Sequence, residues 1–232
     1  MRSKPIIAID GPAASGKSST ARAVARGLGY THIDSGAVYR ACTLVALDRC
    51  GAPPLWTPEA VVLACRTQRV AVHAASGSFE VLVSGFNAEP AIREDRVTAE
   101  VSRVAAMGPV RDYVNGLLRE AAADGGVVMD GRDIGTVVFP DAEVKVYMVA
   151  DPDERARRRL IEKGGATDRV SVEMEAGALQ ERDSRDSRRE VAPLTMAPGA
   201  VPLDTTRLSF AEQVNLVVEL ARKSEGNRRP GG

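Results

Sequence analysis

Residues 11–18 read GPAASGKS and match the pattern G-x-x-x-x-G-K-[S/T] at every fixed position. The apolar run Ile6–Ile9 precedes this match and predicts a buried strand. The following segment places apolar residues from Ala21 onward on one face of a helix that ends at Gly29. A loop between a strand and a helix can bind phosphate, because its N–H groups and the helix N-terminus attract anions. This context argues against a Gly-rich turn that binds nothing.

The phosphate loop predicts a role for each of its polar side chains. We expect Lys17 to reach the β- and γ-phosphates of a nucleoside triphosphate. The hydroxyl of Ser18 or of Ser19 is expected near Mg²⁺, and Asp130 suits a contact to the metal through water. The residues that we expect to bind the nucleoside triphosphate are Gly11, Pro12, Ala13, Ala14, Ser15, Gly16, Lys17, Ser18 and Ser19.

The rest of the chain alternates short apolar strands with helices. Further core strands are predicted at 127–129, 144–149 and 201–204. Helices are predicted over 34–48, from Thr57 onward, over 97–123, from Asp151 onward, over 171–189 and over 209–223. This alternation is typical of a doubly wound α/β domain, in which helices cover both faces of a parallel sheet.

The hydrophobic period changes between residues 69 and 83. Residues 69–73 and 79–83 resemble strands, and Ala-Ser-Gly-Ser between them predicts a turn. We therefore expect a small β-containing subdomain, about 62–102, inserted into a single domain that spans 1–232. The tail 224–232 is expected to be disordered.

Composition excludes several classes of protein. The 232 residues include 31 basic and 31 acidic side chains, and this balance argues against a nucleic acid or a membrane surface as partner. We find no apolar signal segment and no apolar stretch of about 18 residues. Three cysteines without paired spacing fit a reducing cytoplasm, and two histidines are too few for a polyhistidine metal centre.

Three further segments carry a resemblance to a known family. Residues 34–40 read DSGAVYR, residues 130–140 read DGRDIGTVVFP, and residues 181–189 read ERDSRDSRR. Together with the phosphate loop they resemble the bacterial cytidylate kinases, from Ile6 to about Val218. The resemblance implies phosphoryl transfer from ATP to CMP and dCMP with Mg²⁺, and a lid at about 155–170. The expected partners are the small-molecule substrates ATP and CMP or dCMP, with no nucleic acid and no membrane, and the expected form is a cytoplasmic monomer.

The resemblance implies where the acceptor binds. The expected CMP-binding residues are Ser35, Arg40, Ser102, Arg111, Arg132, Asp133, Arg182, Asp186 and Arg189. Arg188 is the alternative to Arg189, and the register from Arg182 favours Arg189. Asp133 is expected to accept from the cytosine amino group, and its carboxylate would repel the oxygen that uracil presents there.

Two helical arginine stripes complete the expected site. Residues at i, i+3 and i+4 share a helical face, so Arg155, Arg158 and Arg159 predict a lid that meets phosphate. By the same spacing, a second face carries Arg182, Arg185, Asp186 and Arg189. The expected catalytic residues are Lys17, Arg132, Arg155, Arg158 and Arg159. His32 and His73 are expected to be structural.

Two other functions remain open at this point. The first is a kinase for another monophosphate or another small metabolite, against which the DGRD and ERDSRDSRR segments argue. The second is a nucleotide switch, for which a guanine-reading Asn-Lys-x-Asp segment would be expected, and none is present.

Overall fold

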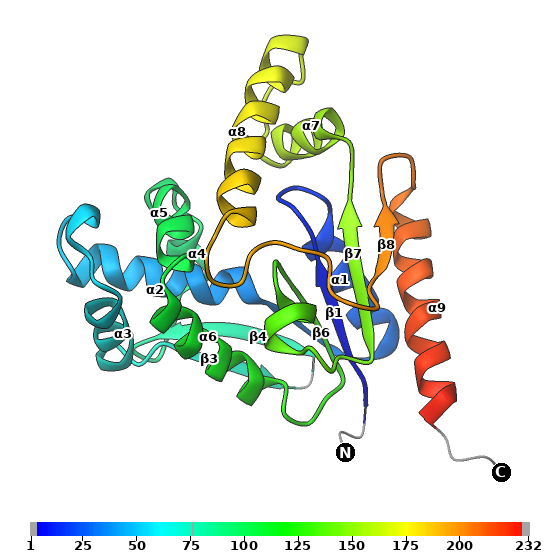
Figure 1. Ribbon diagram of the computed structural model, residues 1–232, viewed down its shortest axis with the longest axis horizontal. Helices are drawn as coiled ribbons and strands as arrows, with labels where there is room; N and C mark the ends of the chain where they lie inside the picture. Colours follow the sequence, from blue (N-terminus) through cyan, green and yellow to red (C-terminus); the bar gives the residue numbers. More distant parts are fainter. Residues whose placement is uncertain (1–3, 76, 229–232) are drawn as a thin grey trace.

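The computed structural model describes residues 4–75 and 77–228. Its centre is a five-stranded sheet of order β2-β6-β1-β7-β8 in which every neighbouring pair is parallel (Figure 1). The strands are β1 (Ile6–Asp10), β2 (Thr31–Asp34), β6 (Val127–Gly131), β7 (Val144–Val149) and β8 (Val201–Asp204). The predicted doubly wound α/β fold is thereby confirmed.

The central strand β1 is buried along its whole length, and alternate residues serve opposite faces of the sheet. Ile7 and Ile9 belong to one core with α1 (Lys17–Leu28) and α9 (Phe210–Arg228). Ile6 and Ala8 belong to the other core, which includes residues of α2 (Ser35–Arg49) and α6 (Gly108–Ala121). Helices on both faces explain why this strand has no polar side.

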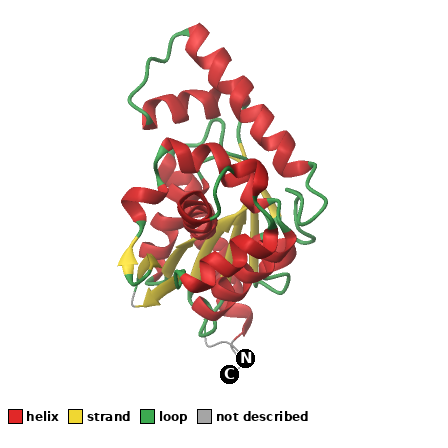
Figure 2. Ribbon diagram, turned by 90° about the vertical axis from the view of Figure 1, so that its left-hand side faces the viewer, coloured by secondary structure: helices red, strands yellow, loops and turns green. Residues whose placement is uncertain are grey.

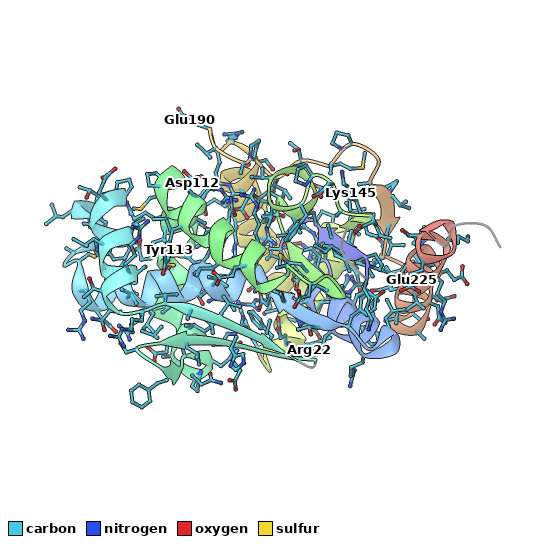
Figure 3. The ribbon with its side chains drawn as sticks, turned by 90° about the horizontal axis from the view of Figure 1, so that it is seen from below. Arg22, Asp112, Tyr113, Lys145, Glu190 and Glu225 are labelled. Carbon is cyan, nitrogen blue, oxygen red and sulfur yellow. The ribbon has the colours of Figure 1, made fainter. Side chains whose placement is uncertain are left out.

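The insert between α2 and α6 combines helices with a second, antiparallel sheet of order β3-β4-β5. Its elements are η1 (Pro53–Leu55), α3 (Pro58–Thr67), β3 (Ala71–Ala75), β4 (Ser78–Val83), β5 (Phe86–Asn87), α4 (Glu89–Ile92) and α5 (Asp95–Ala105). The Tyr113 hydroxyl on α6 donates to the Val70 carbonyl at 3.0 Å and ties this insert to the main domain (Figure 3). Residue 76 of the expected turn lies outside the described residues.

A helical pair lies beyond the carboxyl ends of the central strands and projects from the rest of the molecule (Figures 1 and 2). It consists of α7 (Pro152–Glu162) and α8 (Arg169–Ser187). Asp151 and Asp168 cap the two helices, because their carboxylates accept from N–H groups of the first turn. None of the helices in the described part of the chain is long and apolar enough to cross a membrane.

The structure differs from the predicted elements at three places. Residues 31–34 form the edge strand β2, which we did not predict. The single helix expected over 97–123 is two helices, α5 and α6, because the chain is extended at Met107 and Pro109 starts a new helix. Helix α9 continues to Arg228, so a disordered tail from 224 was wrong for its first part, and 229–232 lie outside the described residues.

Candidate active site

The phosphate loop joins β1 to α1 in a conformation that needs two of its glycines. At Gly11 a Cβ would lie 2.1 Å from the Met148 carbonyl oxygen, so only glycine fits. Gly16 has φ +89°, a left-handed conformation that glycine adopts without strain, and it caps α1. The loop therefore wraps around the space in front of the α1 N-terminus.

Lys17 is the first residue of α1, and its side chain reaches back to this loop. Its Nζ donates to the Pro12 carbonyl at 2.6 Å, and its side chain is buried. Burial, reinforced by the charge of Arg132, lowers the pKa of Lys17 to about 7. An anion in the loop would reverse this effect, since an opposite charge favours the protonated amine.

Ser18 and Asp130 place two side-chain oxygens, both suitable metal ligands, beside Lys17. The Ser18 hydroxyl donates to Asp130 Oδ2 at 2.5 Å, and His32 Nε2 lies 2.7 Å from Oδ1. Burial opposes the charge of Asp130, but hydrogen bonds from His32 and Ser18 hold its pKa below the usual range. The Ser19 hydroxyl instead donates to the Gly16 carbonyl at 3.1 Å, which favours Ser18 over Ser19 as the serine that faces a metal.

One cavity of about 950 Å³ joins this loop to the segments that we expect to hold the acceptor. The expected site residues that line it are Ala13, Ala14, Ser15, Gly16, Lys17, Ser18, Ser19, Ser35, Arg40, Ser102, Arg111, Asp130, Arg132, Asp133, Arg158, Arg159, Arg182, Asp186 and Arg189. Gly11 and Pro12 shape the loop without lining the cavity, and Arg155 does not line it either.

Arg155 contacts the phosphate loop itself and not the cavity. Its Nη1 donates to the Ala13 carbonyl at 3.1 Å and pairs with Asp183 of α8. Asp183 also accepts from the Ala13 backbone N–H at 2.9 Å. Arg155 therefore braces the loop, and its position does not match the phosphate contact that its helical spacing predicted.

The other two arginines of the expected lid do line the cavity. Arg158 donates to the Thr205 hydroxyl at 3.0 Å and to the Thr205 carbonyl at 2.7 Å. Arg159 pairs with Glu162, whose side chain is 68% exposed, so this pair is weak and can exchange for a phosphate.

Arginines from two of the family-like segments line the same cavity. Arg132 of the DGRD segment donates to the Asp186 carboxylate on α8 at 3.0 Å. Burial and the neighbouring charge of Arg132 lower the pKa of Arg182 to about 10, and its buried Nε has no hydrogen-bond partner. Arg189 also lines the cavity, and one of its buried nitrogens, Nη2, has no partner. Crowded, partly unpartnered guanidinium groups fit an anionic ligand.

Two arginines of the same segment, Arg185 and Arg188, do not line the cavity. Arg185 is exposed and pairs with Glu181 on the same helix, so the stripe expected on α8 is shorter than its spacing indicates. Arg188 is exposed, whereas Arg189 donates to the Asp186 carbonyl at 3.1 Å.

A buried polar pair occupies another part of the cavity wall. Arg111 donates to Asp133 and to the Ala105 carbonyl, and its guanidinium lies over the Tyr39 ring at 5.2 Å. Ser102 lines the same cavity. Arg40 is held by the Ile92 carbonyl and by the Thr98 hydroxyl, at 3.2 and 2.8 Å.

Sequence reasoning missed several residues of the site. Further cavity-lining side chains are Arg22, Asp34, Tyr39, Glu89, Arg93, Thr98, Glu162 and Lys163. Asp10 is buried behind the DGRD turn, where it accepts from Ile134 and Gly135 N–H at 2.8 and 2.7 Å. Burial raises the pKa of Asp10 to about 6. The Asp-Ser-Gly-Ala-Val-Tyr segment could have indicated Tyr39, but no spacing rule indicates Asp10 or Asp183.

A phosphate loop and a cluster of arginines in one cavity are typical of a P-loop nucleotide kinase. The family described as cytidylate kinase matches residues 7–223. The cytidylate kinase of Chlorobaculum tepidum is 46% identical over 224 residues, which cover 95% of this chain and 94% of that protein. The corresponding proteins of Pelodictyon phaeoclathratiforme and Streptococcus thermophilus are 45% and 44% identical, over 95% and 94% of this chain and 96% of each relative. This chain belongs to the cytidylate kinase family and is a nucleoside-monophosphate kinase, as the sequence resemblance implied.

Proposed function

We propose that this enzyme transfers the γ-phosphoryl group of ATP to CMP and to dCMP, forming ADP and the corresponding diphosphate. One observation carries the proposal: a single cavity is lined by Lys17 of the phosphate loop and by the acceptor residues Arg132 and Asp133. Family membership supports CMP as the acceptor. In-line transfer then needs only positioning and charge neutralisation, and no protein nucleophile takes part.

Each group of residues has a distinct task in this proposal. Lys17 and the loop N–H groups hold the donor phosphates, and Arg158 and Arg159 neutralise the transferred group. Arg40, Arg132 and Arg189 hold the acceptor phosphate. Arg182 and Asp186 hold the ribose, and Asp133, Ser102 and Arg111 contact the base. We also propose that the insert acts as the nucleotide-binding subdomain and that α7 and α8 act as the lid, which excludes water on closure.

The side-chain oxygens of Ser18 and Asp130, beside Lys17, are suitable ligands for Mg²⁺. The described residues contain no cluster of three acidic, His or Cys side chains, and a Mg²⁺ bound mainly by phosphates and water does not need one. Ser18 would bind the ion, and Asp130 would hold it through water. When bound, Mg²⁺ would neutralise charge on the transferred phosphoryl group.

We propose that the enzyme works as a cytoplasmic monomer on these small substrates alone. The balance of 31 basic and 31 acidic residues supports the absence of a nucleic-acid partner. Cys42, Cys50 and Cys65 are free thiols, as a reducing compartment favours.

ADP release measured with and without CMP tests the proposal. A kinase forms ADP only with an acceptor present. Slow ADP formation that CMP does not stimulate would instead identify a nucleotide switch.

A further inference from the structure

We propose that His32 is a positioning residue for magnesium, and that it acts through Asp130 on the Ser18 hydroxyl. The proposal rests on the proposed function, because it assumes that a Mg²⁺–nucleotide complex binds at Ser18. His32 lies on β2, next to the strand that carries Asp130, and its Nε2 is 2.7 Å from Asp130 Oδ1. The two side chains are 11% and 4% exposed.

The hydrogen bonds around Asp130 have a defined direction. A carboxylate only accepts, so His32 Nε2 carries the proton of this bond and Ser18 donates to the other oxygen, Oδ2. The proton of the Ser18 hydroxyl is thus turned toward Asp130, which leaves the oxygen lone pairs for a cation. His32 fixes the carboxylate in the orientation that keeps this arrangement.

A purely structural role explains the side chain less well. Strand β2 pairs with β6 through its backbone along Thr31–Asp34, and this ladder does not need the imidazole. Without His32, Oδ1 of a nearly buried carboxylate loses a donor and the carboxylate can turn away from Ser18. Outer partners of this kind commonly change metal affinity or activity by about 10- to 100-fold.

The test compares His32→Phe, which keeps a planar ring without a donor, with His32→Gln, whose amide can donate. The affinity for ADP is measured by calorimetry with and without Mg²⁺, so the readout does not depend on turnover. We expect His32→Phe to weaken Mg²⁺-dependent ADP binding about 10-fold and to leave metal-free binding unchanged. His32→Gln should recover most of the loss, and His73→Ala, at the exposed second histidine on β3, should have no effect.

A double variant tests the route through Asp130. In an Asp130→Asn background, His32→Phe should cause little further loss, because the two residues act as one unit. Equal losses of ADP affinity with and without Mg²⁺, or an unchanged Mg²⁺ dependence in folded His32→Phe, would overturn the proposal. If His32→Phe does not fold, failure of His32→Gln to keep the wild-type Mg²⁺ dependence would overturn it.

The wild-type protein separates this inference from the function on which it rests. Wild-type ADP binding that Mg²⁺ does not strengthen would overturn the magnesium assignment and the role of His32 together. A wild-type Mg²⁺ effect that survives in His32→Phe overturns the role of His32 alone.

Discussion

The Arg111 guanidinium and the Asp133 carboxylate form an ion pair inside the wall of the cavity, where their side chains are 2% and 4% exposed. Arg111 bonds Oδ2 of Asp133, so Oδ1 can still accept a hydrogen bond from a ligand. An ionised carboxylate in this position matches the cytosine amino group and repels the uracil oxygen. In the proposed function, Arg111 supports base choice by holding the Asp133 carboxylate in place.

Asp133→Asn should therefore narrow the preference for CMP over UMP. We expect kcat/KM for CMP to fall about 10- to 100-fold, because a hydrogen bond to a charged group contributes roughly 1.5–3 kcal/mol. The value for UMP should change less, since the amide can donate to the uracil oxygen. Asp112→Asn, at the exposed neighbour of Arg111 on α6 (Figure 3), is the matched control. An unchanged CMP-to-UMP ratio in a folded Asp133→Asn variant would show that Asp133 does not read the base.

Nucleotide binding should be accompanied by uptake of a proton on Lys17. With a pKa of about 7, this amine is mostly neutral at about pH 8 in the free enzyme. Donor phosphates favour the charged form and raise the pKa, so binding takes up about one proton at that pH and much less at about pH 6. Calorimetry in buffers of different ionisation enthalpy measures this number. Lys17→Met should take up fewer protons than wild type and should also lose turnover by orders of magnitude. Equal proton uptake by Lys17→Met and wild type would show that Lys17 is not the group that binds the proton.

Arg158→Ala and Arg159→Ala should lower kcat more than they change KM for CMP. Contacts to the transferred group are strongest in the transition state, and loss of one such donor commonly costs about 10²-fold in kcat. Arg157→Ala is the control, because this exposed arginine lies on the same helix and does not line the cavity. An effect confined to KM for CMP would contradict a lid role.

Asp183→Ala should destabilise the protein. It leaves the Ala13 N–H without its acceptor and Arg155 without its carboxylate partner. The Asp183 and Arg155 side chains are 16% and 9% exposed. Breaking a buried pair on one side costs about 3–5 kcal/mol, so we expect a loss of free energy of unfolding near the lower end of that range. Chemical denaturation measures it. Asp183→Asn, whose amide oxygen can still accept from Ala13, should lose less, and equal stability of all three proteins would refute the brace.

The parts of the fold with strong local signals could be predicted from the sequence. Strand β1 is a continuous apolar run before a complete loop motif, and both features depend on neighbouring residues alone. Strand β2 was not predicted because Ile33 is its only fully buried residue, so no apolar run marks this edge strand. The break before α6 could have been predicted from Gly108-Pro109, since proline favours the first turn of a helix.

The sequence indicated which residues belong to the candidate site, but it did not indicate which of them contact one another. Helical spacing grouped Arg155 with the lid arginines, but its partners Ala13 and Asp183 lie in other segments and are set by the packing of α7 and α8 on the loop. His32 gave no signal, because its contact with Asp130 joins positions 98 residues apart. Only the tertiary structure brings such pairs together.

The central claim is that this cavity accepts cytidine monophosphates, and the most direct test is the rate of ADP formation from ATP and Mg²⁺ with CMP, dCMP, UMP or AMP as acceptor. We predict the highest kcat/KM with CMP and dCMP, a clearly lower value with UMP, and no acceptor activity with AMP. A preference for AMP or UMP over CMP, or ADP formation independent of all four, would contradict the account.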